Sequence, residues 1–507
     1  MIEFRDVSIF LLKNERPLLK NFNFVLNKGD KIAIIGEEGN GKSTLLKAIY
    51  NPQDIESYCH LSGFINTKGL KIGYLEQQLS DKWDNLYVDE YFLKDNPHDD
   101  IDYDRYNKLG DILKILADLN IKTNILDNKQ KISSLSGGEK VKLQLAKIIA
   151  SSPDVLLLDE PTNDLDIETL EWLELFINDA KQPVLFISHD ETLLENVTNG
   201  IIHLEQIKKK KEARHVIAPV SYCEYVIQRK DEINKQNQLA QSDSSQYQKE
   251  MFILKQIKEE VRKANPERTN RMDALIAQEK KLANRQRILK MDVEEVVNIK
   301  LVDGVSVPRG KVILDYQLDN LNIKGLTLAT NINLNITGPE HIAIIGQNGV
   351  GKTTLMRQIY AALKDREDIK VGYMPQDYDE MLNLNQRAID FLTSDKNTNV
   401  RTLLGSMKFT SDEVVSKIDQ LSNGQKAKLV LLKMIIEQCN VLLLDEPTRN
   451  LSPLTNPAIR ELLKNFQGAI ISISHDRKYL ADVCDLIYEL KSDGLYMVSS
   501  YKTGKQP

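Results

Sequence analysis

The chain lacks the residue patterns that stabilise secreted and membrane-spanning proteins. Its four cysteines are widely separated among 507 residues, and no CxxC pair occurs. Neither a disulfide framework nor a Cys-ligated zinc site is therefore expected. Apolar runs such as Val155–Leu158 and Val441–Leu444 are far shorter than the roughly 20 residues of a transmembrane helix. The opening MIEFRDVSIF is unlike a secretory signal, so we expect a cytoplasmic protein with no membrane contact.

Glycine is missing from one long segment. None occurs between Ile201 and Asp303, where Pro219 and Pro266 are the only prolines, and Gln, Lys, Glu and Asn dominate. This composition favours long solvated helices. Because proline cannot continue a helix, Pro266 marks a break. We predict an antiparallel helical hairpin over 221–298, with its tip near 264–271. Two apolar seams typical of packed, coiled-coil-like helices support it: Tyr247, Met251, Leu254 and Val261, then Leu275, Leu282 and Leu289.

The segment without glycine also carries a charge of its own. Residues 207–300 contain 21 Lys+Arg and 14 Asp+Glu, a net charge of +7 in a chain whose formal total is −6. A basic, extended element on an acidic protein indicates a polyanionic partner. A solvated hairpin with incidental lysines is the alternative reading.

The chain repeats itself around this segment. IAIIGEEGNGKST at 32–44 returns as IAIIGQNGVGKTT at 342–354, and three later motifs return at an offset of 286 residues. These are LSGGE (135–139) and LSNGQ (421–425), VLLLDEPT (155–162 and 441–448), and ISHD (187–190 and 473–476). We therefore expect an α/β fold with two P-loop nucleotide-binding domains, 1–206 and 301–507, joined by a hairpin linker, 207–300.

The first copy is longer than the second. Its phosphate loop and LSGGE are separated by 24 residues more than the corresponding motifs of the second copy. Part of this insertion lies around 81–121. It is either an interaction element or a neutral surface excursion.

Each copy contains a phosphate-binding loop. Gly36 to Ser43 and Gly346 to Thr353 both fit GxxxxGK[ST], where glycines turn backbone N–H groups toward phosphate oxygens. Lys42 and Lys352 would reach the β- and γ-phosphates, and the hydroxyl groups of Ser43 and Thr353 would bind Mg²⁺. The predicted phosphate-contacting residues are Gly36, Glu37, Glu38, Gly39, Asn40, Gly41, Lys42, Ser43 and Thr44, then Gly346, Gln347, Asn348, Gly349, Val350, Gly351, Lys352, Thr353 and Thr354.

Two adjacent carboxylates end each VLLLDE strand. Asp159 and Asp445 would hold Mg²⁺, which prefers oxygen ligands. Glu160 and Glu446, one residue later, would orient and deprotonate the attacking water. The catalytic set is completed by the histidines that follow later strands and suit γ-phosphate contact: His189 and His475.

Together these motifs resemble the ABC ATPase family, whose signature is LSGGE. The resemblance implies two ATP molecules sandwiched between the halves, each phosphate loop facing the signature of the other half. Gln77 and Gln376 resemble the family's Q-loop ligands of Mg²⁺. Site one would combine the first phosphate loop with Ser422 and Gly424. Site two would combine the second loop with Ser136, Gly137 and Gly138.

The two halves are not equivalent. Asn423 replaces a glycine of the second signature, and the second half reads Arg449-Asn-Leu-Ser452-Pro453 where the first has Asn163-Asp-Leu-Asp166. The usual D-loop aspartate is thus missing there. We expect the two sites to turn over at different rates. The side chain that stacks on adenine is not evident, and Phe10 is a candidate.

Tandem domains, an insertion after the first Q-loop and a charged hairpin resemble the ABC-F branch, whose members act on the ribosome. This resemblance implies a monomer that pairs its own domains and binds the 70S ribosome, with the hairpin in the tRNA exit site near 23S rRNA and tRNA. DEPTRNLSP further resembles the antibiotic-resistance members, which protect the peptidyl-transferase centre. The alternatives are a housekeeping translation factor and the tandem ATPase subunit of a membrane importer. The candidate RNA contacts at the tip are Arg262, Lys263, Asn265, Pro266, Arg268 and Arg271, and we expect Asn265, Pro266 and Glu267 to lie deepest.

Overall fold

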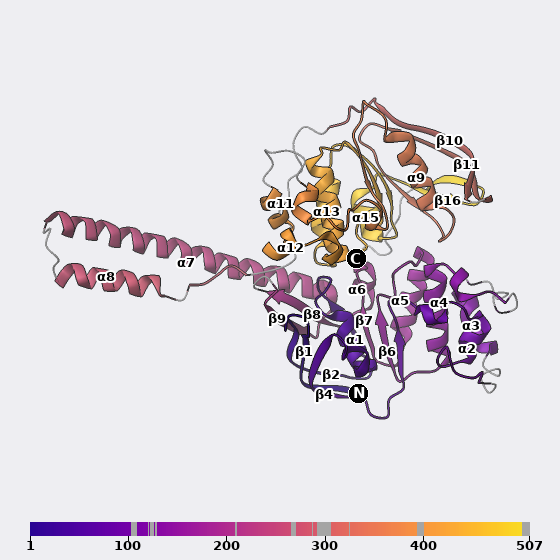
Figure 1. Cartoon of the computed structure of the whole chain (residues 1–507), viewed down its shortest axis with the longest axis horizontal. Helices are drawn as coiled ribbons and strands as arrows, with labels where there is room; N and C mark the ends of the chain where they lie inside the picture. The colour runs from indigo at the N-terminus through magenta and orange to yellow at the C-terminus, as the bar shows by residue number, and fades with distance from the viewer. Residues whose placement is uncertain are drawn as a thin grey trace. The chain divides into compact units, whose positions relative to one another are not determined.

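The computed structural model describes residues 1–102, 109–119, 121, 126, 129–207, 210–264, 270–285, 287–291, 306–323, 325–392 and 400–498. They form two compact units. The larger contains Met1–Tyr222 with Glu294–Pro507, and the smaller is Cys223–Val293. Both copies of the repeated motifs lie in the larger unit, and the segment without glycine contains the whole of the smaller one (Figure 1).

Each copy of the repeat is built on a six-stranded sheet. Five strands run parallel and the edge strand, β9 or β17, is antiparallel. The central strands are continuous apolar runs because helices cover both faces of such a sheet. In sheet order, the first copy has β5 (Ile72–Leu75), β6 (Val155–Asp159), β7 (Val184–Ile187), β3 (Lys31–Ile35), β8 (Gly200–Ile207) and β9 (Glu212–Ala218). The second has β13 (Val371–Met374), β14 (Val441–Asp445), β15 (Ala469–Ile473), β12 (His341–Ile345), β16 (Leu486–Lys491) and β17 (Gly494–Val498).

A smaller antiparallel sheet accompanies each large one, and here the copies differ. Within the described residues, the first has three strands, β2 (Pro17–Leu26), β1 (Ile2–Leu11) and β4 (Cys59–Asn66), whereas the second has two, β10 (Val312–Ile323) and β11 (Leu326–Thr337). Lys42 precedes Gln77 by 35 residues, but Lys352 precedes Gln376 by 24. Eleven of the extra residues of the first copy therefore lie in the part that contains β4, ahead of the 81–121 region.

Helices complete the larger unit. The first copy has α1 (Lys42–Tyr50), α2 (Val88–Leu93), α3 (Leu109–Asp118), α4 (Gly137–Ala150), α5 (Ile167–Asp179) and α6 (Glu191–Val197). The second has α9 (Lys352–Leu363), α10 (Ala388–Leu392), α11 (Val400–Ser406), α12 (Ser411–Val415), α13 (Asn423–Ile436), α14 (Asn456–Lys464) and α15 (Arg477–Val483). Short 3₁₀ helices are η1 (Pro52–Ile55), η2 (Asp81–Trp83), η5 (Ile132–Ser134), η6 (Tyr378–Glu380) and η7 (Ile418–Gln420).

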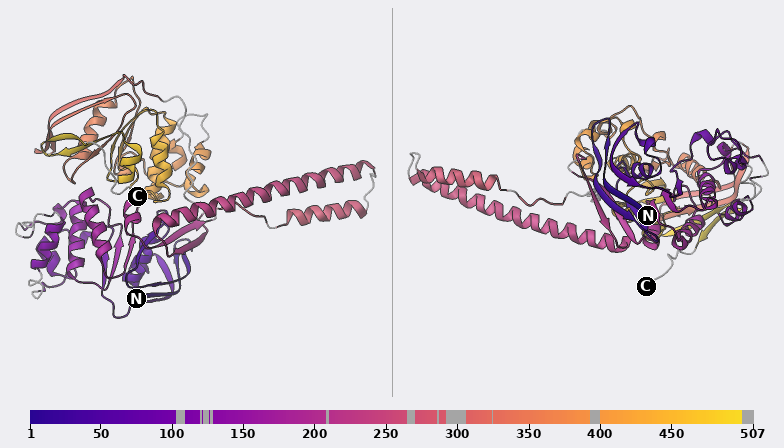
Figure 2. Two further views of the ribbon diagram at one scale, coloured as in Figure 1. Left: turned by 180° about the vertical axis from the view of Figure 1, so that it is seen from behind. Right: turned by 90° about the horizontal axis from the view of Figure 1, so that it is seen from below.

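The smaller unit is a helical hairpin of α7 (Tyr222–Ala264) and α8 (Asn270–Ala283). The two helices lie side by side in every view (Figures 1 and 2). They run antiparallel, because Lys258 of α7 pairs with Glu279 of α8, while Asp243, earlier in α7, pairs with Arg285 beyond α8. The predicted fold class, two α/β nucleotide-binding domains with a helical hairpin between them, is confirmed. Among the described residues, no helix has the length and apolar character needed to cross a membrane.

One detail of the predicted hairpin is wrong. The sequence predicts a second helix that continues to residue 298 with Leu289 in its seam, but α8 ends at Ala283 and the Leu289 side chain is 73% exposed. Polar side chains of α7 bond the backbone of the following segment instead. Gln236 donates to the carbonyl of Leu289 at 2.8 Å. Because these backbone groups already have partners, a further helical turn gains little.

Ion pairs join the two copies within the larger unit. The second copy mostly supplies the cations and the first the carboxylates. Arg460 of α14 binds Glu191 of α6, and both side chains are less than 10% exposed. Further pairs of this kind are Arg477–Glu174, Lys478–Glu195, Arg449–Asp164 and Lys428–Glu37, and the charges are exchanged in Lys210–Glu413.

The buried pair of Arg460 and Glu191 gives a stability prediction. Arg460→Ala leaves Glu191 buried, with Lys478 at 3.4 Å as its remaining cation among the described residues. Removing one partner of a buried pair costs about 3–5 kcal/mol, so we expect a clearly lower unfolding midpoint in denaturant. Arg387→Ala, which breaks an exposed pair with Asp390, is the matched control and should cost less than about 1 kcal/mol. Equal shifts for the two variants would contradict the importance of the buried contact.

Candidate active sites

The two phosphate loops have the same backbone conformation. Each connects a buried strand, β3 or β12, to a helix, α1 or α9. Gly36 and Gly346 adopt φ values of 141° and 144°. A Cβ at Gly36 would come within 2.2 Å of the carbonyl oxygen of Leu204. Glycine is therefore needed at this position for close backbone approach as well as for conformation.

The shared pattern of the loops places a buried lysine inside each. Lys42 donates to the carbonyl oxygens of Gly36 at 2.8 Å and Glu37 at 3.1 Å. Lys352 makes the matching bonds to Gly346 at 2.7 Å and Gln347 at 3.0 Å. Both ammonium groups thus lie within the curve of the loop, where phosphate oxygens would be received.

A hydroxyl group and a carboxylate converge beside each lysine. Ser43 donates to Asp159 at 2.9 Å, and Asp159 is 1% exposed. Burial, and then the neighbouring Glu160, raise the pKa of Asp159 to about 6. In the second copy Asp445 Oδ2 is buried with no hydrogen-bond partner among the described residues. A hard cation would satisfy these oxygens, so the residues present fit Mg²⁺.

The catalytic candidates of the first copy form a compact pair. His189 Nε2 lies 2.8 Å from Glu160 Oε1, and His189 Nδ1 lies 2.6 Å from the carbonyl oxygen of Leu451 in the other copy. Burial alone would raise the pKa of Glu160, but His189 and then Lys42 hold it below the usual value. Glu160 is therefore an ionised carboxylate, suited to accept a proton from water.

The same two residues are arranged differently in the second copy. His475 Nε2 and Glu446 Oε1 are 3.9 Å apart, and His475 Nδ1 has no partner among the described residues. Burial and then Asp445 raise the pKa of Glu446 to about 8, and burial lowers that of His475 to about 3. The two sites therefore differ in the contact between their glutamate and their histidine, and a difference in turnover rate remains a prediction.

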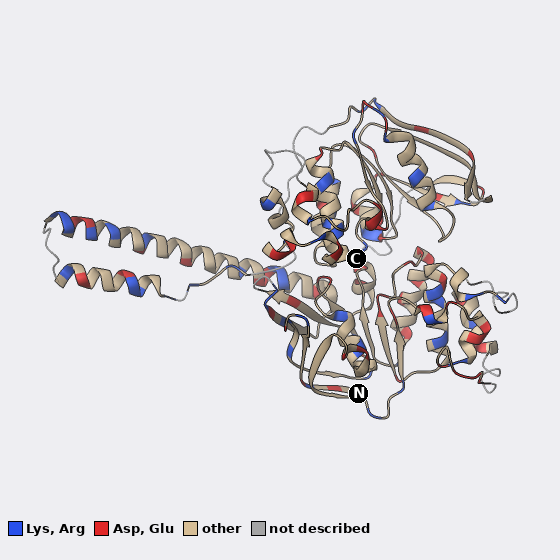
Figure 3. Cartoon of the chain, in the orientation of Figure 1, with Lys and Arg blue, Asp and Glu red and all other residues tan. Residues whose placement is uncertain are grey.

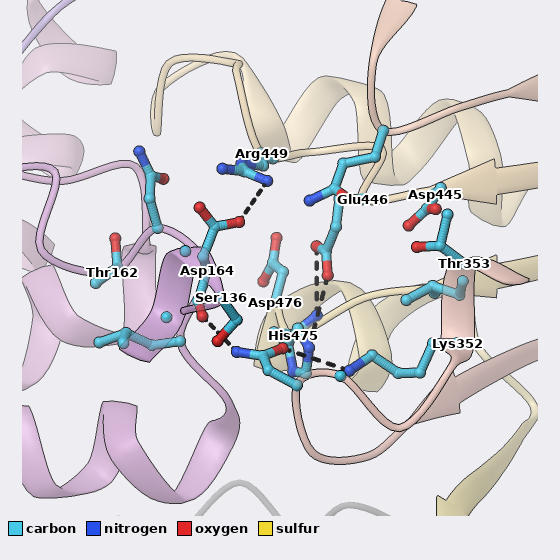
Figure 4. A pocket seen from close by; sticks show the side chains of 18 of the residues that line it. Ser136, Thr162, Asp164, Lys352, Thr353, Asp445, Glu446, Arg449, His475 and Asp476 are labelled. Atoms are coloured by element: carbon cyan, nitrogen blue, oxygen red, sulfur yellow. Dashed lines mark hydrogen bonds and ion pairs between the residues drawn. The ribbon is translucent and has the colours of Figure 1, made fainter. Parts of the chain in front are cut away.

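Site two is a cavity of about 450 Å³ between the copies. Its walls combine the second phosphate loop and Gln376 with the signature of the first copy. Figure 4 shows Lys352, Thr353, Asp445, Glu446 and His475 facing Ser136 and Asp164 across this cavity. The site residues that the sequence predicts and that line it are Ser136, Gly137, Gly138, Asn348, Gly349, Gly351, Lys352, Thr353, Thr354, Gln376, Asp445, Glu446 and His475, together with His189 of the first copy.

Site one is a smaller cavity of about 320 Å³. Arg449 and Asn450 of the second copy close it, whereas Ser422 and Gly424 do not line it. The Gly424 amide instead donates to the Glu38 carboxylate at 2.5 Å. The predicted residues that line site one are Glu38, Gly39, Gly41, Lys42, Ser43, Thr44, Gln77, Glu160 and His189.

Capping places each signature serine at the start of its helix. Ser136 and Glu139 form a reciprocal capping box at the N-terminus of α4, and Ser422 and Gln425 form the same box on α13. Each signature therefore forms the N-terminus of a capped helix. At a helix N-terminus, the first amide groups and the helix dipole favour an anion.

Several predicted residues have other contacts. The Asn40 side chain donates to the Leu204 carbonyl at 3.0 Å and so supports the loop from behind. Val350 packs against the apolar core. Phe10 does not line site one, where Leu11 and Arg16 do. Successive side chains of a strand point to opposite faces, so a one-residue error in β1 selects the wrong side chain.

Comparison with known proteins agrees with this geometry. A family model described as ABC transporter matches residues 19–163 and 329–449. ATP-binding protein Uup of Buchnera aphidicola subsp. Schizaphis graminum is 30% identical, over 96% of this chain and 81% of that protein. ABC transporter F family member 5 of Arabidopsis thaliana is 25% identical, over 94% of this chain and 73% of that protein. Archaeal ribosome recycling factor aABCE1, solved with ribosomal stalk protein aP1, shares the fold with a TM-score of 0.60 at 16% identity, over 97% of this chain and 90% of that one.

The two composite cavities and these matches define an ATP-hydrolysing protein of the ABC family. More narrowly, the chain belongs to the tandem-domain ABC-F branch of that family.

The difference between the sites gives a kinetic prediction. We expect Glu160→Gln and Glu446→Gln to leave different residual rates of phosphate release, because the Glu160 carboxylate contacts its histidine closely and that of Glu446 does not. The double variant should lose at least about 100-fold, the usual contribution of a general base. Steady-state phosphate release with Mg²⁺-ATP measures all three variants. Equal residual rates for the two single variants would refute the inequivalence.

Proposed function

We propose that this protein is an ATP-driven ribosome-binding protein whose hairpin enters the tRNA exit site. The observation that carries the proposal is the basic antiparallel hairpin inserted between two ATP-hydrolysing domains. A connector needs neither the 43 residues of α7 nor a net charge of +7 over 207–300. At about 1.5 Å per residue, α7 is roughly 65 Å long, enough to reach deep into a large particle.

The net positive charge of the hairpin lies at its tip and along its second arm. Residues 261–290 contain nine basic and three acidic side chains, and Figure 3 shows Lys and Arg along both helices. Arg285 and Arg287 pair with Asp243 inside the hairpin. The last turn of α7 presents two exposed cations, Arg262 and Lys263, of which Lys263 pairs with the exposed Glu259 at 3.1 Å, and the first turn of α8 presents Arg271. Such positions suit RNA phosphates. Asn265, Pro266, Glu267 and Arg268 lie outside the described residues.

The relatives support a translation-related role. The Arabidopsis relative is named as an F-family member, and the archaeal protein of the same fold is named as a ribosome recycling factor. Only the second of these names refers to the ribosome. A membrane importer subunit is disfavoured, because such a subunit has no use for a long basic hairpin.

The proposed cycle uses both parts of the chain. Binding of two Mg²⁺-ATP closes the halves of the monomer, and the closed form docks the hairpin on 23S rRNA in the exit-site region of the 70S ribosome. Hydrolysis then releases the protein into the cytoplasm.

The finer proposal is protection against antibiotics of the peptidyl-transferase centre. On this account the tip, near 264–271, alters the drug site or a bound tRNA so that the drug leaves. DEPTRNLSP supports this reading. The second candidate is a housekeeping translation factor of the same branch. Expression in a drug-sensitive host separates the two, because only the first raises the inhibitory drug concentration.

Ribosome binding is tested with the hydrolysis-deficient protein. We expect the Glu160→Gln/Glu446→Gln variant to co-sediment with bacterial 70S ribosomes when ATP is present and to remain in the supernatant without it. The reason is that the closed state, once formed, cannot reset. Sedimentation through sucrose followed by immunoblotting measures the bound fraction. Failure to sediment in either condition would contradict the proposal.

The RNA contacts are tested by charge reversal. Replacing Arg262, Lys263 and Arg271 by Glu in the same trapped background should weaken ribosome binding by at least about tenfold, since three phosphate contacts are lost. The matched control reverses three exposed lysines of the ATPase domains, Lys28, Lys68 and Lys364. Equal effects from both sets would show general electrostatic attraction, not contact at the tip.

A further inference from the structure

The D-loop aspartate of the first copy joins two neighbouring residues. Asp166 caps α5 and accepts hydrogen bonds from the Thr169 amide at 3.0 Å and from the Thr169 hydroxyl at 2.5 Å. Its other oxygen lies 3.8 Å from Lys142 Nζ, on signature helix α4. Burial opposes ionisation of Asp166, but Thr169 and then Lys142 hold its pKa low. The aspartate thereby connects the D-loop to the signature helix within one copy.

The second copy has the same two neighbours but no aspartate. Thr455 and Lys428 correspond to Thr169 and Lys142 at the repeat offset of 286 residues, whereas the residue at the aspartate's position is Ser452. Lys428 and Thr455 are both buried, at 4% and 0% exposure. A buried ammonium group without a counter-charge is costly, so a carboxylate from elsewhere is needed.

The missing carboxylate comes from the other copy. Glu37, in the first phosphate loop, accepts a hydrogen bond from the Thr455 hydroxyl at 2.6 Å. Its second oxygen lies 3.3 Å from Lys428 Nζ on signature helix α13. Burial opposes ionisation of Glu37, but Lys428 and then Thr455 lower its pKa. Glu37 therefore binds Thr455 and Lys428, the two residues that correspond to the partners of Asp166 in the first copy.

Glu37 connects different elements from those that Asp166 connects. Glu37 belongs to the phosphate loop of site one, and its carbonyl oxygen accepts from Lys42 at 3.1 Å. Its side chain therefore links that loop directly to the opposing signature helix, next to the bond from Gly424 to Glu38. At the equivalent position of the second loop, Gln347 is exposed. Within the part of the chain that the structure describes, this link belongs to site one alone.

We propose that Glu37 is a positioning residue of site one, which replaces the missing D-loop aspartate from the opposite copy and couples the first phosphate loop to the second signature helix. The inference rests on the ATPase activity alone and is independent of ribosome binding. It predicts that closing of site one depends on Glu37, whereas closing of site two depends on Asp166.

The test isolates one site at a time in the purified full-length chain. In the Glu446→Gln background only site one hydrolyses, and Glu37→Gln should slow single-turnover hydrolysis of Mg²⁺-ATP by about tenfold, the effect of losing a charged hydrogen bond. In the Glu160→Gln background the same substitution should change the rate of site two by less than about twofold. Circular dichroism of each variant checks its folding.

Rescue distinguishes positioning from a general structural defect. Adding Ser452→Asp to Glu37→Gln restores a carboxylate beside Lys428 and Thr455, and should recover most of the site-one rate. The reciprocal experiment uses the first copy, where Asp166→Ser should slow site two and Gln347→Glu should restore it. If Glu37→Gln does not fold, Asp166→Ser and its rescue by Gln347→Glu test the proposal in its place. An unchanged site-one rate in Glu37→Gln, or a loss that neither added carboxylate rescues, would overturn the proposal.

Discussion

The phosphate chain of ATP carries charge on all sides, whereas a phosphate loop supplies donors on only one. In site two, the capped signature helix α4 places its first residues, Ser136, Gly137 and Gly138, on the open side, where its amide groups can serve as a second set of donors. In site two the loop around Lys352 and the signature around Ser136 line a single cavity. Residues of both halves line each of the two cavities.

The same constraint explains why the halves can differ without losing the fold. Each six-stranded sheet is held by its own core, so substitutions at the contact between halves alter the sites and leave the sheets intact. His189 bonds Glu160 closely while His475 stands away from Glu446. Glu37 compensates for Ser452 from across the interface. The asymmetry therefore includes a difference between the phosphate loops. The first loop is bonded to the opposite half through the Glu37 side chain, whereas the equivalent residue of the second loop, Gln347, is exposed.

The fold and the main site residues follow from sequence because strict local motifs encode them. Glycines at positive φ, a lysine inside the loop and carboxylates at the end of a buried strand are chemical requirements at fixed spacing. The sequence does not show that Leu11 lines site one in place of Phe10. Successive side chains of a strand point to opposite faces, so an error of one residue selects the wrong side chain. The end of α8 at Ala283 depends on bonds from α7 side chains to backbone groups far along the chain. The role of Glu37 depends on a contact between residues 391 apart, Glu37 and Lys428, although the differing loops, GEEG and GQNG, and the serine at 452 are visible when the two copies are compared.

The central claim is that each ATP site is assembled from both halves, and epistasis between substitutions tests it most directly. Ser136→Arg would block the first signature, and its effect on ATP hydrolysis is measured alone, with Lys352→Ala and with Lys42→Ala. The account predicts that Ser136→Arg adds nothing to Lys352→Ala, because both disable site two, and abolishes the remaining hydrolysis when combined with Lys42→Ala. The opposite pattern, in which Ser136→Arg is redundant with Lys42→Ala, would place each signature with its own phosphate loop and contradict the account.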